Sequence, residues 1–335
     1  MAVEAVIFQQ IVDINWDQAI YTASPNNTIN VAQFAAKGSG TNIGIALTPK
    51  GTGFITAQVP DGAAAGGNTR GTSAVDFQTA RAAATQVASG TRSALIATNG
   101  SRAASTYSAC IGATNSAATA EGAVVIAGTS ATASGQYAVA TGGSTASGDY
   151  SFASGVSCTA SGIYSRAVGV FCTATEDGAF ASGRFARAHR FGMRVHAASQ
   201  FGVVVGSSQA FKQTIGAKTT DATPAEMGLN NAGTLIRFNI LADTVVDAVV
   251  SVCGVKSDGS AVARYQRQVT IKRVGSTTSL VGSVITLGTD EAAGTALAIT
   301  ADDTNDSLKI EVTGIAAETW RWSGLINGTE MIIGT

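Results

Sequence analysis

The chain has 335 residues, enough for two or three domains, and only 13% of them are charged although 45% are hydrophobic. Much of the hydrophobic share is alanine and only 6% of residues are aromatic, so most of the chain lacks the bulky side chains of an ordinary globular core. The formal net charge of -1 argues against a nucleic-acid partner, because a surface that binds phosphates needs clustered Lys and Arg.

We expect no membrane insertion, no metal and no cofactor. The opening residues, Met1 to Glu4, show no basic region followed by an apolar one, and no stretch of about 18 uninterrupted apolar residues follows. The protein is therefore expected to be made in a cytosol. The cysteines form no CxxC pair and have no histidine at metal-ligand spacing, which predicts reduced structural thiols. They are Cys110, Cys158, Cys172 and Cys253.

Two regions precede the repetitive part of the chain. Residues 1–29 contain a short periodic segment that suits a helix or a strand equally well. Residues 30–90 are predicted to form an N-terminal shaft, in which Asn30 to Gln58 alternate apolar residues with Gly and Pro turns and so predict short strands. Within this shaft, Ala74 to Val87 is the one plausible helix, with Ser73 as its N-cap and an end near Gly90.

Residues 91–201 carry an internal repeat of about fourteen residues. Fourteen is also two heptads, but each line holds one to three glycines, and each glycine costs about 1 kcal/mol in a helix interior, so a coiled coil is excluded. Glycine does not recur at every third residue, so collagen is excluded too. The lines start at Glu121, Gly135, Gly148, Gly162 and Glu176, with looser copies at Ser93 and Ser108.

An even period preserves the in-out alternation of a strand, so each line is predicted to be one coil of a parallel β-roll. In the line from Gly148, the candidates for a tight interior are Ser151, Ala153 and Gly155. The opposite face of the same line carries Phe152, Ser154 and Val156.

An interior of Ala, Ser and Gly buries little area, so at about 25 cal/mol per Å² a single roll is marginal against backbone entropy. We therefore expect several chains to associate through the larger residues that alternate with the small interior ones. The aromatic residues near the start of each repeat would contribute to the same contact. Solvent-exposed packing over neighbouring coils is the alternative. These residues are Val139, Phe152, Arg166, Phe180, Tyr137, Tyr150 and Tyr164. Cys158 and Cys172 hold equivalent places and should stack as small hydrophobes.

Several segments resemble known fibrous proteins. SFASG and SRAVG, within Ser151 to Thr175, resemble the left-handed parallel β-roll in the heads of trimeric autotransporter adhesins. Residues 42–62 and 70–90 resemble shaft segments of bacteriophage tail-fibre proteins, and the C-terminal third resembles a terminal domain attached to such shafts. An autotransporter would also need a signal peptide and a C-terminal membrane barrel, so the resemblance favours the phage family.

After Gly202 the period stops and longer alternating strands begin, separated by polar turns. Residues 202–335 are predicted to form an antiparallel β-sandwich. Turns are expected at Ser257 to Ser260 and at Asp302 to Asp306. The expected strands are Thr234 to Ile240, Asp247 to Lys256, Val262 to Val274, Ser279 to Leu287, Ala296 to Thr300, Leu308 to Thr313 and Thr319 to Asn327.

No catalytic constellation stands out. His189 and His196 lie among arginines without a nucleophile motif, which predicts a basic patch. Glu176 and Asp177 are interpreted as ordinary turn residues. The acidic run from Asp302 to Asp306 offers oxygen ligands but lacks the spacing of a calcium loop, so no metal is predicted there.

The candidate receptor-binding residues lie in the C-terminal region. Trp320 and Trp322 share one face of a strand, where they suit a core or a trimer axis, or could stack on a sugar if exposed. Polar contacts would then come from Arg264, Tyr265 and Arg267 on a neighbouring strand.

The sequence therefore predicts an all-β, elongated homotrimer with a β-roll shaft and a C-terminal sandwich. The resemblance implies a non-enzymatic phage tail fibre that forms part of the virion. Residues 1–29 would attach to a tail or baseplate protein, residues 30–90 and 91–201 would form the shaft, and residues 202–335 would bind a host surface glycan or protein. Two alternatives stay open: a tailspike depolymerase acting on host polysaccharide, and a structural or ice-binding solenoid.

Overall fold

A computed structural model describes residues 16–21, 31–36, 46–202, 204–230 and 234–333. The chain divides into two units, Met1–Gly51 and Thr52–Thr335. In the first unit, β1 (Trp16–Tyr21) and β2 (Val31–Ala36) form an antiparallel pair. Of the predicted attachment segment, only β1 lies within the described residues. No helix in the described part of the chain is long and apolar enough to cross a membrane.

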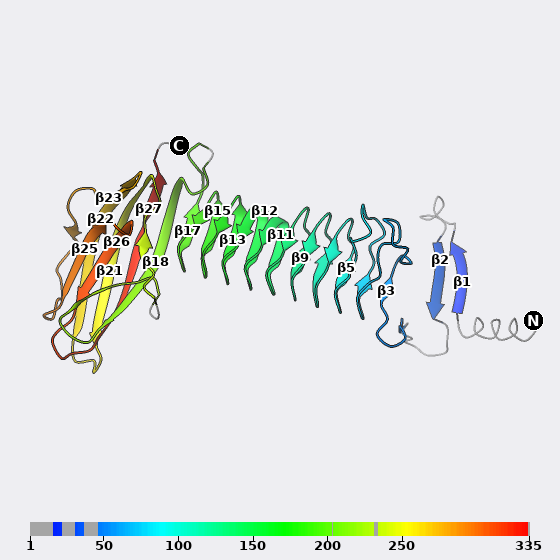
Figure 1. Cartoon of the computed structure of the whole chain (residues 1–335), viewed down its shortest axis with the longest axis horizontal. Coiled ribbons are helices and arrows are strands. Elements are labelled where there is room, and N and C mark those ends of the chain that lie inside the picture. Colours follow the sequence, from blue (N-terminus) through cyan, green and yellow to red (C-terminus); the bar gives the residue numbers. More distant parts are fainter. Residues whose placement is uncertain (1–15, 22–30, 37–45, 203, 231–233, 334–335) are drawn as a thin grey trace, which may run out of the picture. The chain divides into compact units, whose positions relative to one another are not determined.

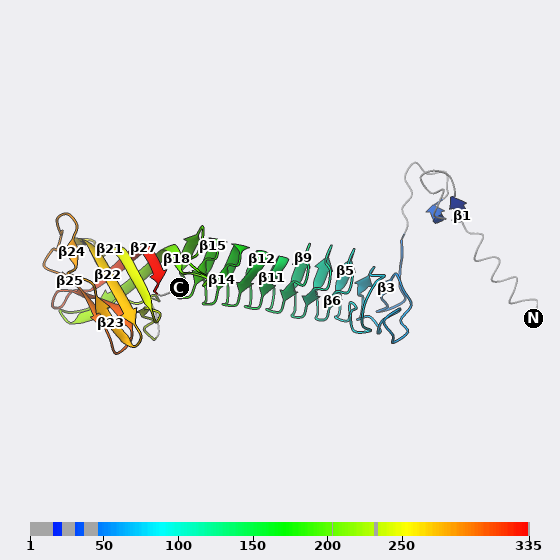
Figure 2. The same cartoon turned by 90° about the horizontal axis from the view of Figure 1, so that it is seen from above.

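The second unit begins with a parallel β-solenoid, which Figures 1 and 2 show as a regular stack of coils. Each complete coil contributes one strand to each of two parallel stacks, which we call the first and second files. Equivalent strands pair in parallel from one coil to the next. The first file contains β3 (Ile55–Thr56), β4 (Val75–Asp76), β5 (Ala94–Ile96), β7 (Ala109–Ile111), β9 (Val124–Ile126), β11 (Val139–Ala146), β12 (Phe152–Ala160), β13 (Arg166–Val170), β15 (Phe180–Arg184) and β17 (Arg194–Ala197). The second contains β6 (Arg102–Ala103), β8 (Ala117–Ala118), β10 (Thr132–Ala133), the ends of β11 and β12, β14 (Thr173–Ala174) and β16 (Arg187–Ala188). The predicted all-β class and the repeat of about fourteen residues are confirmed.

The coils are less uniform than the sequence lines suggested. Equivalent residues are 15 positions apart between Ser101 and Ser116, whereas 13 positions separate Thr141 from Ser154. Later coils return to 14, as between Ser182 and His196. The difference arises at the corners, because the longer coils use two left-handed residues between the files and the shortest coil uses Gly142 there.

Alanine is the commonest residue in the interior of the solenoid. Ala140, Ala153 and Ala167 lie directly above one another in the first file and are fully buried. The predicted inward positions Ser151 and Ala153 are confirmed, whereas Gly155 is only half-buried, as is Phe152 on the opposite parity. The second file repeats the arrangement with Ala133, Ala146, Ala160, Ala174 and Ala188. The earlier coils have a wider interior, because Leu95, Cys110 and Val125 are fully buried in register with Ala140.

Aromatic side chains stack along the corners of the solenoid. The ring centroids of Tyr137 and Tyr150 are 5.4 Å apart, and those of Tyr150 and Tyr164 are 5.1 Å apart. These tyrosines remain between 47% and 64% exposed, so they cover neighbouring coils without being buried by them. Phe171 and Phe185 form a second stack at 5.3 Å.

The predicted helix from Ala74 to Val87 does not form. The segment makes another coil, in which Val75 pairs in parallel with Ile55 on one side and Ala94 on the other. Asp76 is fully buried there and accepts a hydrogen bond of 2.7 Å from Nε of Arg70. The prediction was wrong because Ala80, Ala82 and Ala83 are exposed between the strands of the coil, so their helix propensity is overridden by the parallel pairing of Val75 and Asp76.

Antiparallel sheets follow the solenoid, and β17 leads into them by pairing with β18 (Ser208–Thr219). The larger sheet continues through β27 (Trp320–Ile332), β21 (Thr244–Lys256) and β22 (Val262–Val274), with β23 (Thr277–Leu280) and β24 (Ile285–Thr286) at its edge. The second sheet contains β19 (Pro224–Glu226), β26 (Ser307–Thr313), β20 (Phe238–Asn239) and β25 (Ala296–Asp302). Phe211 of the first sheet packs on Phe238 of the second, with ring centroids 5.7 Å apart.

Most C-terminal strands lie where the alternation predicts them, and Val262–Val274 has the predicted bounds. The turn at Ser257 to Ser260 is confirmed, with Gly259 in a left-handed conformation. The strands that were missed are β18 and the short β19, and β18 is the longer of the two. Its inward positions include Gln209 and Gln213, which are buried, so the apolar alternation that marks a strand is interrupted.

Candidate functional site

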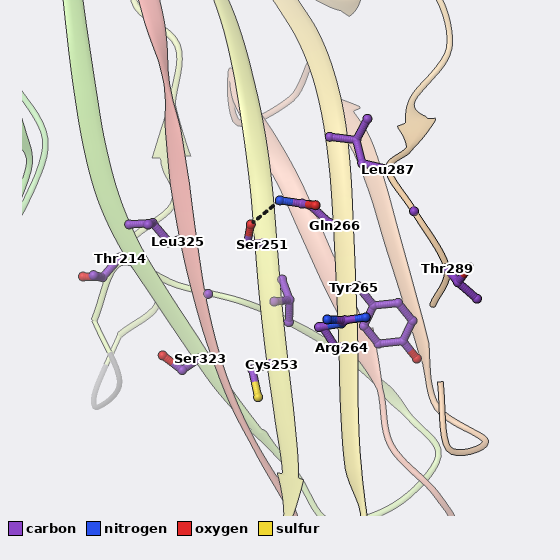
Figure 3. A pocket seen from close by; sticks show the side chains of 13 residues that line it. Thr214, Ser251, Cys253, Arg264, Tyr265, Gln266, Leu287, Thr289, Ser323 and Leu325 are labelled. Carbon is purple, nitrogen blue, oxygen red and sulfur yellow. Dashed lines mark hydrogen bonds between the residues drawn. The ribbon is translucent and has the colours of Figure 1, made fainter. Parts of the chain in front are cut away.

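A groove of about 710 Å³ crosses the larger antiparallel sheet on the face that carries its polar side chains (Figure 3). The strands place Thr214, Leu325, Ser251 and Gln266 in one row, since each lies opposite the next in the strand register. Gln266 donates a hydrogen bond of 3.4 Å to Ser251 across this row. A neighbouring row across the same strands contains Ser323, Cys253 and Arg264. Leu287 and Thr289, which follow β24, line the side of the groove beside β22.

The two predicted tryptophans point away from this groove. Trp320 and Trp322 are 0% and 3% exposed, and their rings stack with centroids 5.6 Å apart. Nε1 of Trp322 donates to Oγ1 of Thr219 at 3.1 Å, and Nε1 of Trp320 donates to Glu318 at 3.0 Å. Both indoles therefore belong to the core, which is the first of the two places the sequence allowed for them.

The three other predicted residues all lie on β22 but occupy different environments. Tyr265 is buried, and its hydroxyl lies 2.7 Å from Oγ1 of Thr295. Arg267 binds both carboxylate oxygens of Asp290, at 2.7 and 2.6 Å, and this hydrogen-bonded pairing keeps the pKa of Asp290 below its usual value. Arg264 is exposed in the groove. The structure therefore does not bring the five predicted residues together on one surface.

Several residues of the groove were not recognised in the sequence. Thr214 belongs to the missed strand β18, while Ser251, Ser323 and Leu325 occupy outward positions of β21 and β27. Their alternation with buried neighbours was visible, but the order in which the strands pair was not. Such a row can be found only when the sheet order is known.

The predicted basic patch at the end of the solenoid is partly a buried ion pair. Arg190 is 4% exposed, and its Nη2 lies 2.6 Å from Oε1 of Glu330 on β27. Its guanidinium also lies 4.3 Å from the ring centroid of Phe238, and Nε donates to the carbonyl of Asn239 at 2.7 Å. His189 contacts the same carboxylate at 3.4 Å. These contacts join the last solenoid coil to the antiparallel sheets.

Glu330 remains charged in this buried setting. Burial alone would raise its pKa, but the positive charge of Arg190 and the contact with His189 outweigh it and hold the pKa well below the usual range. Gln209 donates a hydrogen bond of 3.0 Å to the second carboxylate oxygen. Both oxygens of Glu330 are therefore satisfied.

The acidic residues considered in the sequence serve local turns. Asp177 accepts a hydrogen bond of 2.8 Å from the backbone N–H of Ile163 in the preceding coil. Asp302 accepts from the backbone N–H groups of Thr304 and Asn305, which lowers its pKa together with the side-chain hydrogen bond from Asn305. Within the described ranges, no group of three or more His, Cys, Asp or Glu residues is placed to hold a metal ion.

The cysteines should differ sharply in reactivity towards iodoacetamide. Cys110, Cys158 and Cys172 are buried and Cys253 is exposed, and burial raises the pKa of Cys110 to about 11. We expect mass spectrometry of the native protein to find alkylation at Cys253 alone, and alkylation of all four cysteines after denaturation. Labelling of Cys158 or Cys172 at the rate of Cys253 would contradict the buried stack.

No protein-family model matches the chain, and no curated protein matches it significantly. Among solved structures, the chain is similar to the tailspike protein gp49 of the Acinetobacter baumannii bacteriophage Fri1, described as a capsular polysaccharide depolymerase. The two share 9% sequence identity with a TM-score of 0.25. The match covers 78% of this chain and 51% of the tailspike, so the chain spans about half the length of that protein.

The expectation that the chain is not an enzyme is corrected by this comparison. The similar structure belongs to an enzyme, so the non-enzymatic classification is withdrawn. A likeness of this extent transfers no activity, and the chain stands as an all-β protein in which a parallel β-solenoid leads into antiparallel sheets.

Proposed function

We propose that the chain is a bacteriophage tail protein that binds the host cell surface, and that it acts as a homotrimer. The observation that supports this most is the joining of a long parallel solenoid to antiparallel sheets that carry an open groove. In such a protein the solenoid gives reach and the terminal domain makes contact with the host. Three terminal domains would let weak sites act together, because binding of one raises the effective concentration of the others.

The outer face of the solenoid supports association of several chains. Ile96, Ile111 and Ile126 are stacked in register on this face and remain 40%, 40% and 44% exposed. The positions two residues earlier in the same strands are also uncharged: Ala94, Ala109 and Val124. An exposed apolar stripe of this kind is a surface that a second copy of the chain could bury. We propose that this stripe, Ala94 to Ile126 in the first file, forms the contact between chains.

A charged residue within the stripe should weaken the assembly. We expect Ile111→Arg to lower the native mass, measured by light scattering, or to lower the melting temperature of the assembly, because an unpaired charge would be buried between chains. Val156→Arg is the matched control. Val156 is 55% exposed, and it lies in register with Val170 and then Arg184, so an arginine is already tolerated at this place in another coil. Equal behaviour of the two variants would contradict the proposed contact.

Binding to bacteria tests the function itself. Fluorescently labelled full-length protein would be added to a panel of capsulated strains and to acapsular mutants of the same strains. We expect strain-selective labelling of intact cells, and absence of labelling across a broad panel would contradict host binding. Reducing ends released from the purified capsule of any labelled strain would distinguish a depolymerase from an adhesive fibre.

A further inference from the structure

The groove lies on a sheet face that carries an excess of positive charge. The exposed cations that point outward from β18, β27 and β22 on this face are Lys212, Lys218, Arg264, Lys272 and Arg321. Among the described residues, none of their side chains forms an ion pair or hydrogen bond. Two acidic residues lie on the same side: Asp247, whose carboxylate accepts a hydrogen bond of 2.6 Å from Thr270, and Glu291, which lies opposite Arg264 in an antiparallel bridge. The formal net charge of -1 for the whole chain therefore conceals a local cationic surface.

Two of these cations lie directly opposite each other. Lys218 of β18 faces Arg321 of β27 in the strand register. Like charges at a cross-strand pair destabilise a sheet, by roughly 0.2–1 kcal/mol. Elsewhere in the antiparallel sheets cations have partners, as in Arg273 with Asp306 at 2.8 Å and Lys256 with Glu318 at 3.0 Å. The unpaired cations gather on the face that contains the groove.

Arg264 extends the positive surface to the other side of the groove. It lies on β22, two strands away from Arg321 on β27, which is about 10 Å across the sheet. Glu291 lies opposite Arg264 in an antiparallel bridge, and the two residues exchange backbone hydrogen bonds. Their side chains form no ion pair. The guanidinium of Arg264 therefore remains available to an anion in the groove.

The space between the cations has the chemistry of a saccharide site. Thr214, Ser251 and Ser323 offer hydroxyl groups, and Gln266 offers an amide, within a groove of about 710 Å³. Ligand sites of this size range are common in proteins, and convergent polar groups fix the orientation of the ligand. Guanidinium groups bind carboxylates with strong, charge-assisted hydrogen bonds.

We propose that this face binds an acidic polysaccharide, with Lys218, Arg321 and Arg264 contacting its carboxylate groups. The row of Thr214, Ser251, Ser323 and Gln266 contacts the sugar hydroxyls. A second copy of the chain is a poor occupant, because association through this face would bring like charges together. The inference deepens the proposed host binding and rests on it for its biological meaning.

Binding to polygalacturonate, an acidic polysaccharide, tests this inference. The variant K218Q/R321Q is compared with the control K50Q/R102Q, which removes the same charge from exposed positions outside the sheet. We expect the affinity at low salt to fall about tenfold or more in K218Q/R321Q and to change less than about twofold in the control. The melting temperature of K218Q/R321Q should not fall, because a repulsive pair is removed.

Two further probes exclude other occupants. Dextran, a neutral polysaccharide, should not bind the wild-type protein at the same concentration. A single-stranded oligothymidylate should bind more weakly than polygalacturonate, because the sheet face lacks exposed aromatic rings for stacking bases. Equal loss of polygalacturonate binding in both double variants, no loss in either, or tighter binding of the oligonucleotide would overturn the proposal.

Cell binding separates this inference from the proposed function. If wild type and K218Q/R321Q label capsulated cells equally, the acidic-polysaccharide site is wrong while host binding stands. If no strain is labelled but polygalacturonate binding depends on Lys218 and Arg321, the site stands and the host-binding function fails.

Discussion

Replacing Gly169 by alanine is expected to destabilise the solenoid by about 3 kcal/mol or more, or to prevent its assembly. Gly169 has φ of +129°, a conformation that L-residues with a side chain rarely adopt. A Cβ atom there would lie 1.9 Å from the carbonyl oxygen of Gly183 in the next coil. Since this contact is with backbone, the two coils would have to separate. Thermal unfolding followed by circular dichroism measures the effect.

Gly192→Ala is the matched control for this prediction. Gly192 lies in the same solenoid with φ of +63°, and the nearest atom to an added Cβ is 4.0 Å away. In other coils the corresponding corner is occupied by Tyr150 and Tyr164, also at positive φ. The control should therefore cost about 1 kcal/mol. Similar melting temperatures for Gly169→Ala and Gly192→Ala would contradict the close approach of the coils.

Removing Arg190 is expected to destabilise the junction between the solenoid and the antiparallel sheets by about 3–5 kcal/mol. The substitution Arg190→Ala leaves the carboxylate of Glu330 buried with its main positive partner gone. It also removes the guanidinium from the ring of Phe238, 4.3 Å away. Arg194→Ala is the control, because Arg194 is an exposed arginine of the next coil and should cost less than about 0.5 kcal/mol. Chemical denaturation monitored by tryptophan fluorescence reports on the sheets.

The double variant Arg190→Ala with Glu330→Gln distinguishes the ion pair from simple packing. If the buried charge is the main penalty, removing both charges should restore part of the stability lost in Arg190→Ala. If the losses of unfolding free energy in Arg190→Ala and in Glu330→Gln simply add in the double variant, the two side chains act independently. The account of the junction would then be wrong.

The same pair predicts a dependence of stability on acid. Because the pKa of Glu330 is lower in the folded chain than the ordinary value of 4.5, the charged form stabilises the folded state. This contribution is fully present above pH of about 4.5 and is lost as the pH falls through the folded pKa. Wild type should therefore lose more stability than Glu330→Gln when the pH is lowered from about 5 to 3. Parallel acid profiles would contradict the assignment.

The solenoid interior could be predicted because its physics is local. An even repeat keeps the same parity inside, and Ser151, Ala153 and Ala167 are buried at the positions that this parity predicts. The coil lengths could not be predicted, since one residue more or fewer at a corner such as Gly142 changes the length without changing the parity of the strands. The segment from Ala74 to Val87 was misread because its alanines favour a helix locally, whereas the neighbouring coils pair with Val75 and Asp76 as a strand.

The candidate site depended on strand pairing that the sequence does not contain. The alternation in Trp320, Arg321 and Trp322 showed that both indoles share a face, but only the second sheet decides that this face is inside. Lys218 and Arg321 are more than a hundred residues apart, and they meet because β18 pairs with β27. With β18 missed, their pairing could not be anticipated.

The native mass of the purified full-length protein is the measurement that tests the proposed assembly most directly. Light scattering should give three times the 33.6 kDa of one chain, and the species should migrate as an oligomer on an SDS gel unless it is boiled. A monomer at all accessible concentrations would contradict the trimeric host-binding fibre. It would then leave the exposed isoleucine stripe unexplained and favour a solitary structural solenoid.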